Sequence, residues 1–194
     1  MFHFFAFIDR MRYIHRWGLM RSTISENLTE HAQQTAMIAH ALVLIENRRF
    51  GADLNPDRAA VLALYHDASE TITGDLPTPI KYYNREILGS YRAVEDYAKD
   101  TLLTKLPEYL QEDYSDILNG EAEPEWIYVK AADTLSAYIK CITERQAGKR
   151  EFVSAEQTLW EKLQSMDLQS LRVFEKEFLG SFGKTLDEMT EEYL

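Results

Sequence analysis

Four side chains of this sequence could together bind a metal ion: His31, His66, Asp67 and Asp133. Each lies in a segment with helical periodicity, at a phase that turns it toward the apolar core. A core-facing carboxylate such as Asp133 must be exposed, salt-bridged or bound to a cation, because an unpaired buried charge is costly. Two imidazoles and two carboxylates suit Mn, Co, Fe, Ni or Zn and leave positions open for water and a phosphate oxygen. The pattern therefore predicts metal-dependent hydrolysis of a phosphate ester.

Glu70 is the candidate acid or base beside this metal site. It follows His66 by four residues, a spacing that puts two side chains on one face of a helix. Its carboxylate is expected in the outer sphere of the metal, where it could hold the attacking water or protonate the leaving oxygen. The sequence leaves these two tasks open, together with the alternative that Glu70 is an ordinary surface glutamate.

The helix expected to carry His31 has a clear start in the sequence. Asn27 followed by Glu30 is a capping-box pattern, which predicts a helix from residue 27 to about residue 47. His31 begins the apolar stripe of this helix and therefore points inward.

Two further helices are expected to complete the site. An Asn-Pro pair at 55–56 predicts the start of the first, because proline suits the first helical position, and the apolar stripe that follows reaches His66. Adjacent residues on a helix differ in direction by about 100°, so His66 and Asp67 are expected to flank one ion from this single helix. A helix over 124–146 carries Asp133 on its inner side. Other helices are expected over residues 4–17, 83–106, 154–164 and 168–179.

The rest of the chain agrees with an all-α helical bundle. No strand alternation, internal repeat or linker interrupts the helical periodicity, so the sequence predicts a single domain over 1–194. Hydrophobic residues make up 45% of the chain, but no run of about 18 apolar residues could span a bilayer. The apolar segment 1–8 is interpreted as a core-facing helix rather than a signal peptide. A lone Cys141 excludes an internal disulfide and suits a reducing cytoplasm.

The charge distribution limits the class of ligand. A formal net charge of −11 argues against a nucleic-acid polymer as partner, because polyanion binding needs a basic face. Four arginines nevertheless lie within 9–21, against one aspartate. This segment either attracts a small phosphorylated ligand or forms a solvated basic helix.

The metal-ligand pattern identifies a resemblance. A histidine, an adjacent His-Asp pair and a later aspartate form the H…HD…D motif of the HD-domain phosphohydrolases. Here the pair stands in YHDASETITGDLPTPIK (65–81), with NLTEH (27–31) upstream and KAAD (130–133) downstream. Together these segments closely resemble the bacterial 5′-deoxynucleotidase branch of the HD family, from Arg16-Trp17 through Glu144.

The resemblance implies an HD-domain helical bundle with a buried mononuclear metal site. It also implies an enzyme that hydrolyses deoxyribonucleoside 5′-monophosphates to deoxyribonucleoside and phosphate. The expected cofactor is one divalent transition metal ion, Co, Mn or similar, and the expected assembly is a homodimer. In the resembling family Arg16 lies on the phosphate, which its forked donors suit, and Trp17 lies against the sugar. Trp17 as a core aromatic residue is the alternative.

The segment after Glu70 offers two further candidates for substrate binding. Gly74 and two prolines prevent residues 71–79 from continuing as a regular helix, so a stiff loop is expected. Asp75 in this loop could accept a hydrogen bond from a sugar hydroxyl, and Lys81 is a second candidate for the phosphate.

Two other functions remain open at this point. The same metal ligands could serve an HD phosphodiesterase or a nucleotide pyrophosphohydrolase, although more basic residues would then be expected near the site. A non-catalytic nucleotide-binding module would use the metal for structure, but Glu70 and the open coordination positions count against it.

Overall fold

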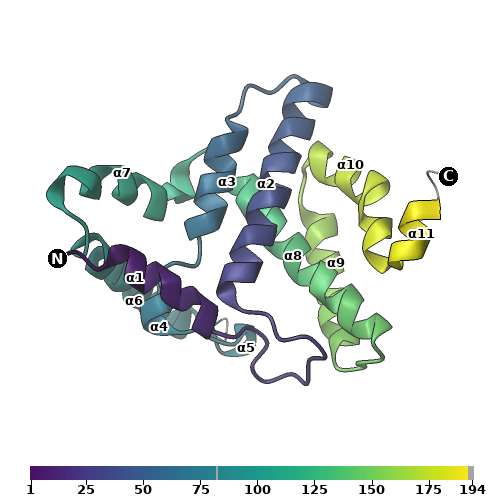
Figure 1. Cartoon of the computed structure of the whole chain (residues 1–194), viewed down its shortest axis with the longest axis horizontal. Helices are drawn as coiled ribbons and strands as arrows, with labels where there is room; N and C mark the ends of the chain where they lie inside the picture. Colours follow the sequence, from purple (N-terminus) through teal and green to yellow (C-terminus); the bar gives the residue numbers. More distant parts are fainter. Residues whose placement is uncertain (82, 192–194) are drawn as a thin grey trace.

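A computed structural model describes residues 1–81 and 83–191 of the chain. Three helices cross at its centre: α2 (Leu28–Phe50), α3 (Pro56–Tyr65) and α8 (Trp126–Gln146). Figure 1 shows α2 and α3 side by side, with α8 running across them. The expected all-α architecture is confirmed, since these described residues contain helices and no strand. None of their helices is both long and apolar enough to cross a membrane.

The remaining elements lie on either side of this centre (Figure 1). The side that includes the N-terminus comprises α1 (Phe4–Ile8), a 3₁₀ turn (Asp9–Tyr13), α4 (Glu70–Thr73), α5 (Thr78–Lys81), α6 (Arg85–Leu103), α7 (Glu108–Leu118) and a 3₁₀ turn (Gly120–Ala122). The other side comprises α9 (Phe152–Ser165), α10 (Gln169–Glu177), a 3₁₀ turn (Leu179–Gly183) and α11 (Leu186–Glu191). Helices α7 and α11 and the short helices α4 and α5 were not predicted from the sequence.

The predicted start of α2 is confirmed at the level of hydrogen bonds. The Asn27 side chain accepts from the backbone N–H of Thr29 and Glu30, and the Glu30 carboxylate accepts from the backbone N–H of Asn27. These bonds satisfy amide groups that have no partner inside the helix. Helix α2 then ends at Gly51, whose positive φ of 75° favours glycine.

The hydrophobic core explains why these helices hold a fixed geometry. Leu42, Leu62 and Leu135, one from each central helix, are fully buried in the main cluster. Burying such a side chain stabilises the fold by roughly 1.5–3 kcal/mol. A second cluster packs Phe4 and Leu102 against Ala68, which lies in the turn after α3. That turn is therefore packed against α1 and α6.

The His-Asp pair does not lie on a helix as predicted. Helix α3 ends at Tyr65, and residues 66–69 form a turn before α4 begins at Glu70. The turn is tightened by hydrogen bonds between residues three apart, such as Ala68 N–H to the Tyr65 carbonyl. The expected loop at 71–79 also starts later, because residues up to Thr73 are helical.

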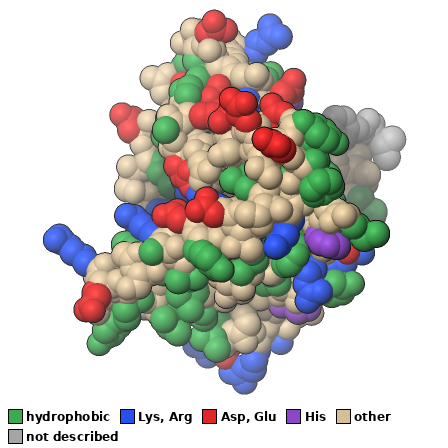
Figure 2. All heavy atoms as spheres, turned by 90° about the vertical axis from the view of Figure 1, so that its left-hand side faces the viewer, with side chains coloured by type: hydrophobic (Ala, Val, Ile, Leu, Met, Phe, Trp, Pro, Cys, Tyr) green, Lys and Arg blue, Asp and Glu red, His purple; other side chains and the backbone are tan. Residues whose placement is uncertain are grey.

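Figure 2 shows the distribution of charge on one face, the N-terminal side of the molecule. Acidic side chains gather in its upper part, hydrophobic ones in its lower part, and Lys and Arg lie mostly toward its edges. This face therefore presents no broad basic surface of the kind that a nucleic-acid polymer requires.

Candidate active site

Three of the four predicted metal ligands converge in the structure. His31 from α2, His66 from the turn after α3 and Asp133 from α8 each offer an atom, and these atoms all lie within 4.8 Å of one another. Asp133 Oδ1 is 3.2 Å from His31 Nε2 and 3.9 Å from His66 Nε2. The cluster therefore draws on α2, on α8 and on the turn that follows α3.

Hydrogen bonds fix which nitrogen of each imidazole is available. His66 Nδ1 lies 2.7 Å from the Ala63 carbonyl, to which it can only donate. His31 Nδ1 lies 3.1 Å from Ser136 Oγ, and that hydroxyl donates in turn to Gln34 Oε1 at 2.7 Å. Because the Ser136 proton is directed to Gln34, Ser136 Oγ accepts from His31. Both Nε2 atoms therefore present lone pairs toward the cluster.

These two Nε2 atoms are the observation that best fits a cation. Both are buried, and within the described part of the chain neither has a hydrogen-bond partner. Their lone pairs nevertheless face carboxylate oxygens at 3.1–3.2 Å, a repulsive arrangement unless a positive charge lies between them. Two imidazole nitrogens and carboxylate oxygens are also the donors that first-row divalent ions accept. The residues present therefore fit the expected metal.

Asp67 lies at the edge of this group. Its Oδ2 is 3.1 Å from His66 Nε2, 3.6 Å from His31 Nε2 and 3.4 Å from Arg16 Nη1. Burial raises the pKa of Asp67, but the two histidines outweigh it and hold that pKa below its usual range. Burial also raises the pKa of Asp133, but its contact with His31 outweighs burial and holds that pKa well below its usual range. Both carboxylates are therefore charged at neutral pH.

Glu70 has the opposite electrostatic character. Its side chain is buried and one carboxylate oxygen, Oε2, has no hydrogen-bond partner among the described residues. Burial and the nearby charges of Asp67 and Asp75 raise its pKa to about 9. Glu70 is therefore protonated at neutral pH in the metal-free protein, the form that a general acid requires.

Arg16 reaches the edge of the metal cluster from the segment before α2. Its side chain is only 15% exposed and makes ion pairs with Asp67 and, through Nε at 3.3 Å, with Glu26. Burial lowers the pKa of Arg16, but the surrounding carboxylates raise it above its usual value, so the guanidinium stays charged. A buried, permanently charged guanidinium beside the cluster is suited to hold a phosphate.

Trp17 has a backbone conformation that is unusual for a residue with a side chain. Its φ is +60°, in the left-handed region. The indole Nε1 donates to Glu26 Oε2 at 2.9 Å, and the ring lies 5.4 Å from that of Phe152. Such a conformation costs of the order of 1–3 kcal/mol and persists only where the surroundings hold it. Trp17 is therefore fixed in place rather than free to move.

Asp75 and Lys81 come from the segment after α4, Asp75 from the loop and Lys81 from the end of α5. Burial raises the pKa of Asp75, while Arg16 lowers it and Asp67 raises it further, which shows that Asp75 shares the electrostatic environment of the site. Lys81 Nζ forms an ion pair with Glu95 at 2.8 Å. A phosphate bound by Lys81 would have to compete with that pair.

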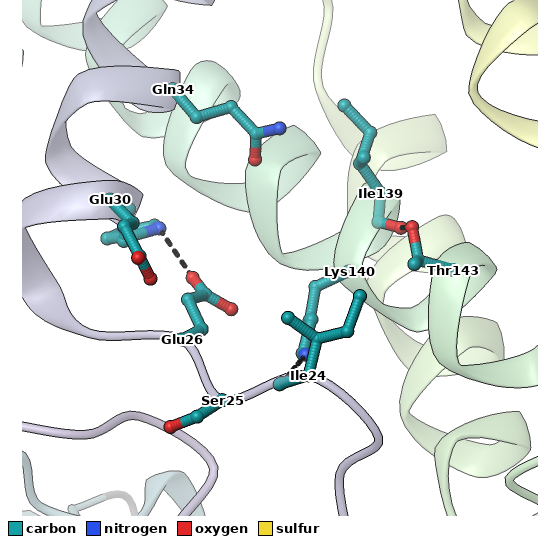
Figure 3. Close-up of a pocket in the computed structure, with 9 residues that line it drawn as sticks. Ile24, Ser25, Glu26, Glu30, Gln34, Ile139, Lys140 and Thr143 are labelled. Atoms are coloured by element: carbon teal, nitrogen blue, oxygen red, sulfur yellow. Dashed lines mark hydrogen bonds and ion pairs between the residues drawn. The ribbon is translucent and has the colours of Figure 1, made fainter. Parts of the chain in front are cut away.

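Glu26 belongs to the site although the sequence analysis did not include it. Its carboxylate contacts Trp17, Arg16 and, at 3.5 Å, His31 Nδ1. It also lines a cavity of about 200 Å³ between α2 and α8 (Figure 3). Burial raises the pKa of Glu26, but His31 and Arg16 outweigh it and lower the pKa overall. The sequence did not indicate Glu26, because this residue lies outside every segment that has helical periodicity.

The loop that carries Arg16 and Trp17 is anchored on α8 by a buried glutamate. Glu144 has no exposed surface, accepts from the backbone N–H groups of Thr23 (2.6 Å) and Ile24 (3.1 Å), and pairs with Lys140. Burial raises the pKa of Glu144, but these hydrogen bonds outweigh it and bring the pKa to about 2. The charged form of Glu144 thus stabilises the loop.

Glu144→Gln is expected to destabilise the protein in a pH-dependent manner. Because the folded pKa lies below the unfolded value, the contribution of Glu144 is present above pH 4.5 and is lost as the pH falls toward 2. The variant should lose about 2 kcal/mol of unfolding free energy at pH 7, and the difference should narrow below pH 5. Urea unfolding between pH 4 and 8 measures this. Glu151→Gln, which removes an exposed pair with Arg21, is the matched control. A difference that is constant with pH would contradict the prediction.

Solved structures with a similar fold define the class. An HD-domain phosphohydrolase from Listeria innocua superimposes with a TM-score of 0.83 at 23% identity, covering 97% of this chain and 92% of that one. A cyanophage S-2L HD phosphohydrolase bound to dA and one catalytic Zn²⁺ ion has a TM-score of 0.65 at 19% identity, covering 93% and 96%. The fold is therefore that of the HD-domain phosphohydrolases.

Sequence comparison then gives the family. The model of the YfbR-like 5′-deoxynucleotidases matches residues 3–182. A 5′-deoxynucleotidase of Erwinia tasmaniensis is 46% identical over 194 residues, 99% of this chain and 98% of that protein. 5′-Deoxynucleotidase YfbR of Escherichia coli O1:K1 is 44% identical over 192 residues, 98% and 96% of the two chains. This chain belongs to the YfbR-like 5′-deoxynucleotidase family.

Proposed function

We propose that this protein hydrolyses deoxyribonucleoside 5′-monophosphates to deoxyribonucleoside and inorganic phosphate. The proposal includes one divalent transition metal ion, such as Co²⁺ or Mn²⁺, held by His31, His66, Asp67 and Asp133. The observation that carries it is the pair of buried Nε2 atoms whose lone pairs face charged carboxylates. Relatives at 44–47% identity that carry the name 5′-deoxynucleotidase support the choice of substrate.

The roles of the side chains follow from their charge states. When bound, the metal supplies Lewis acidity, which makes water easier to deprotonate and offsets charge on the phosphoryl oxygens. Arg16 holds the phosphate through its forked donors. Glu70 donates its proton to the 5′-oxygen as the phosphorus–oxygen bond breaks, and its carboxylate then takes a proton from the water that is consumed. Asp75 accepts from a sugar hydroxyl, and Lys81 adds positive charge near the phosphate.

A screen of phosphate release tests this proposal. Ribo- and deoxyribonucleoside mono-, di- and triphosphates are each incubated with the metal-free protein and one of Mn²⁺, Co²⁺, Mg²⁺ or Zn²⁺. The deoxyribonucleoside 5′-monophosphates should be hydrolysed fastest, and the metal-free protein should be inactive. Release of pyrophosphate from triphosphates would instead support the pyrophosphohydrolase alternative. Binding without any hydrolysis would support a non-catalytic module.

Trp17→Ala is expected to weaken the preference for deoxyribose. The absence of a hydroxyl can be selected only by leaving it no space and no hydrogen-bond partner. The rigidly held Trp17 is the large apolar group beside Arg16 that could close that space. A buried hydroxyl without a partner costs about 1–3 kcal/mol, so the deoxy-to-ribo ratio of kcat/KM should fall by roughly 5- to 150-fold. An unchanged ratio would return Trp17 to the role of a core aromatic.

The assembly and the location belong to the same proposal. We expect the protein to be a homodimer. We also expect it in the reducing cytoplasm, which the single, buried Cys141 suits. Sedimentation equilibrium of the purified protein distinguishes a dimer from the 22.6 kDa monomer.

A further inference from the structure

We propose that Glu26 is a positioning residue for the phosphate step: its carboxylate fixes the guanidinium of Arg16 at the angle from which it can receive the substrate phosphate. This inference rests on the proposed function. It assigns a task to a buried carboxylate that is neither a proposed metal ligand nor the proposed general acid.

The contact between Glu26 and Arg16 uses one edge of the guanidinium. Glu26 Oε1 is 3.3 Å from Arg16 Nε, an ion pair without a hydrogen bond, whereas Arg16 Nη1 donates to Asp67 Oδ2 at 3.4 Å. The two side chains are only 12% and 15% exposed, so water screens the pair little. Because the donors of a guanidinium lie in one rigid plane, holding Nε orients both terminal nitrogens as well.

Asp67 alone could not fix Arg16 during turnover. Asp67 is itself a proposed metal ligand, so its oxygens are shared between two positive groups. Glu26 is not in that set, and its contact with Arg16 does not depend on what Asp67 binds. Glu26 is therefore the partner that can hold Arg16 while the phosphate approaches.

The backbone places Glu26 directly opposite Arg16. The Arg16 N–H donates to the Glu26 carbonyl at 2.9 Å, and the neighbouring pair His15 and Asn27 forms an antiparallel bridge. Side chains alternate between faces in an extended segment, which would send Arg16 and Trp17 to opposite sides. The left-handed backbone at Trp17 interrupts this alternation, and both side chains reach the same Glu26 carboxylate.

Glu26 is not needed to hold the loop on the body of the protein. That loop has separate anchors, because Glu144 accepts from the backbone of Thr23 and Ile24 and Glu151 pairs with Arg21. Figure 3 shows the Glu26 side chain extending from the end of that loop into the space between α2 and α8. A substitution of Glu26 should therefore alter Arg16 without releasing the loop.

The test compares two glutamate-to-glutamine changes four residues apart. Glu26→Gln keeps an oxygen for the indole of Trp17 but places an amide without charge beside Arg16 Nε. Glu30→Gln is the matched control, because Glu30 lines the same cavity. The Glu30 carboxylate caps α2 by accepting from the backbone N–H of Asn27, and glutamine can also accept this hydrogen bond. Both changes remove one negative charge from the same region.

Binding of inorganic phosphate to the Mn²⁺-loaded protein, measured by calorimetry, is the first readout. Glu26→Gln should weaken it about tenfold, because the change removes the charge from an ion pair that water screens little, whereas Glu30→Gln should change it less than about twofold. In a protein that already carries Arg16→Ala, adding Glu26→Gln should weaken phosphate binding by less than about a further twofold, because Glu26 acts through Arg16. Metal content should be equal in wild type and in all four variants.

The kinetic readout separates this inference from the proposed function. With a deoxyribonucleoside 5′-monophosphate, Glu26→Gln should raise KM and lower kcat together, since Arg16 meets the phosphate before and during the reaction. The inference would be overturned if Glu26→Gln bound phosphate as tightly as wild type. It would also be overturned if Glu26→Gln weakened phosphate binding by the same factor with and without Arg16→Ala. A wild-type protein that binds phosphate but hydrolyses no nucleotide would overturn the proposed function alone.

Discussion

Replacing His66 with alanine is expected to abolish metal binding and phosphate release together. His66 Nε2 is buried, faces Asp67 and Asp133, and is fixed by the hydrogen bond from Nδ1 to the Ala63 carbonyl. Alanine offers no donor in its place, and the remaining ligands cannot move closer because the central helices are held by a fully buried core. We expect a loss of at least about 10³ in kcat, since the Lewis acid is removed as a whole.

Two measurements on the same preparation check this result. Metal content is measured by atomic emission, and activity is measured as phosphate release. Helix content by circular dichroism should remain close to that of wild type, because a core of this size does not depend on one ion for folding. His40→Ala, which removes a histidine outside the cluster, is the control and should keep both metal and activity. A His66→Ala or Asp67→Ala protein with full metal content and full turnover would refute the assignment of the site.

Glu70→Gln is expected to lower turnover by about 10² to 10⁴ while leaving metal and substrate binding largely intact. Glutamine has nearly the same shape but no proton that it can transfer to the leaving oxygen. Single-turnover phosphate release from a deoxyribonucleoside 5′-monophosphate measures the loss. Glu112→Gln, an exposed position on α7, should behave as wild type. A loss below about threefold would remove Glu70 from the mechanism.

The same substitution should stabilise the metal-free protein. Burial and the neighbouring carboxylates raise the folded pKa of Glu70 to about 9, above the unfolded value. The folded protein is therefore destabilised, relative to the unfolded chain, by an amount that is absent below pH 4.5 and grows as the pH rises toward 9. Glutamine cannot ionise and avoids this cost, which is about 3 kcal/mol at neutral pH. Urea unfolding at pH 7 should therefore show a more stable variant, with the difference vanishing near pH 4. A variant less stable than wild type at pH 7 would contradict the raised pKa.

The parts of the site that were predictable are those with a local signal. The capping box at Asn27 and Glu30 fixed the start of α2, and the apolar period then gave the inward phase of His31. The same period turned Asp133 on α8 toward the cluster. Both predictions needed only the regular geometry of one helix.

The parts that were missed depend on contacts between distant segments. The prediction that His66 and Asp67 share a helix was wrong because the tight turn after α3 is held by packing on the N-terminal helices, which periodicity cannot show. Glu26 was missed because its role arises from pairing with Arg16 across an antiparallel bridge. The hydrogen-bond chain from His31 through Ser136 to Gln34 likewise joins α2 to α8.

The metal cluster joins residues that are far apart along the chain, and this has a consequence for biosynthesis. His31 and His66 leave the ribosome long before Asp133, which lies in the eighth helix of the described structure. Protein chains emerge from the N-terminus, so a nascent chain that ends before α8 has both histidines and Asp67 but lacks Asp133. Metal loading should therefore follow the docking of α8, and a translation-arrested chain of about 120 residues should bind the ion far more weakly than the finished protein.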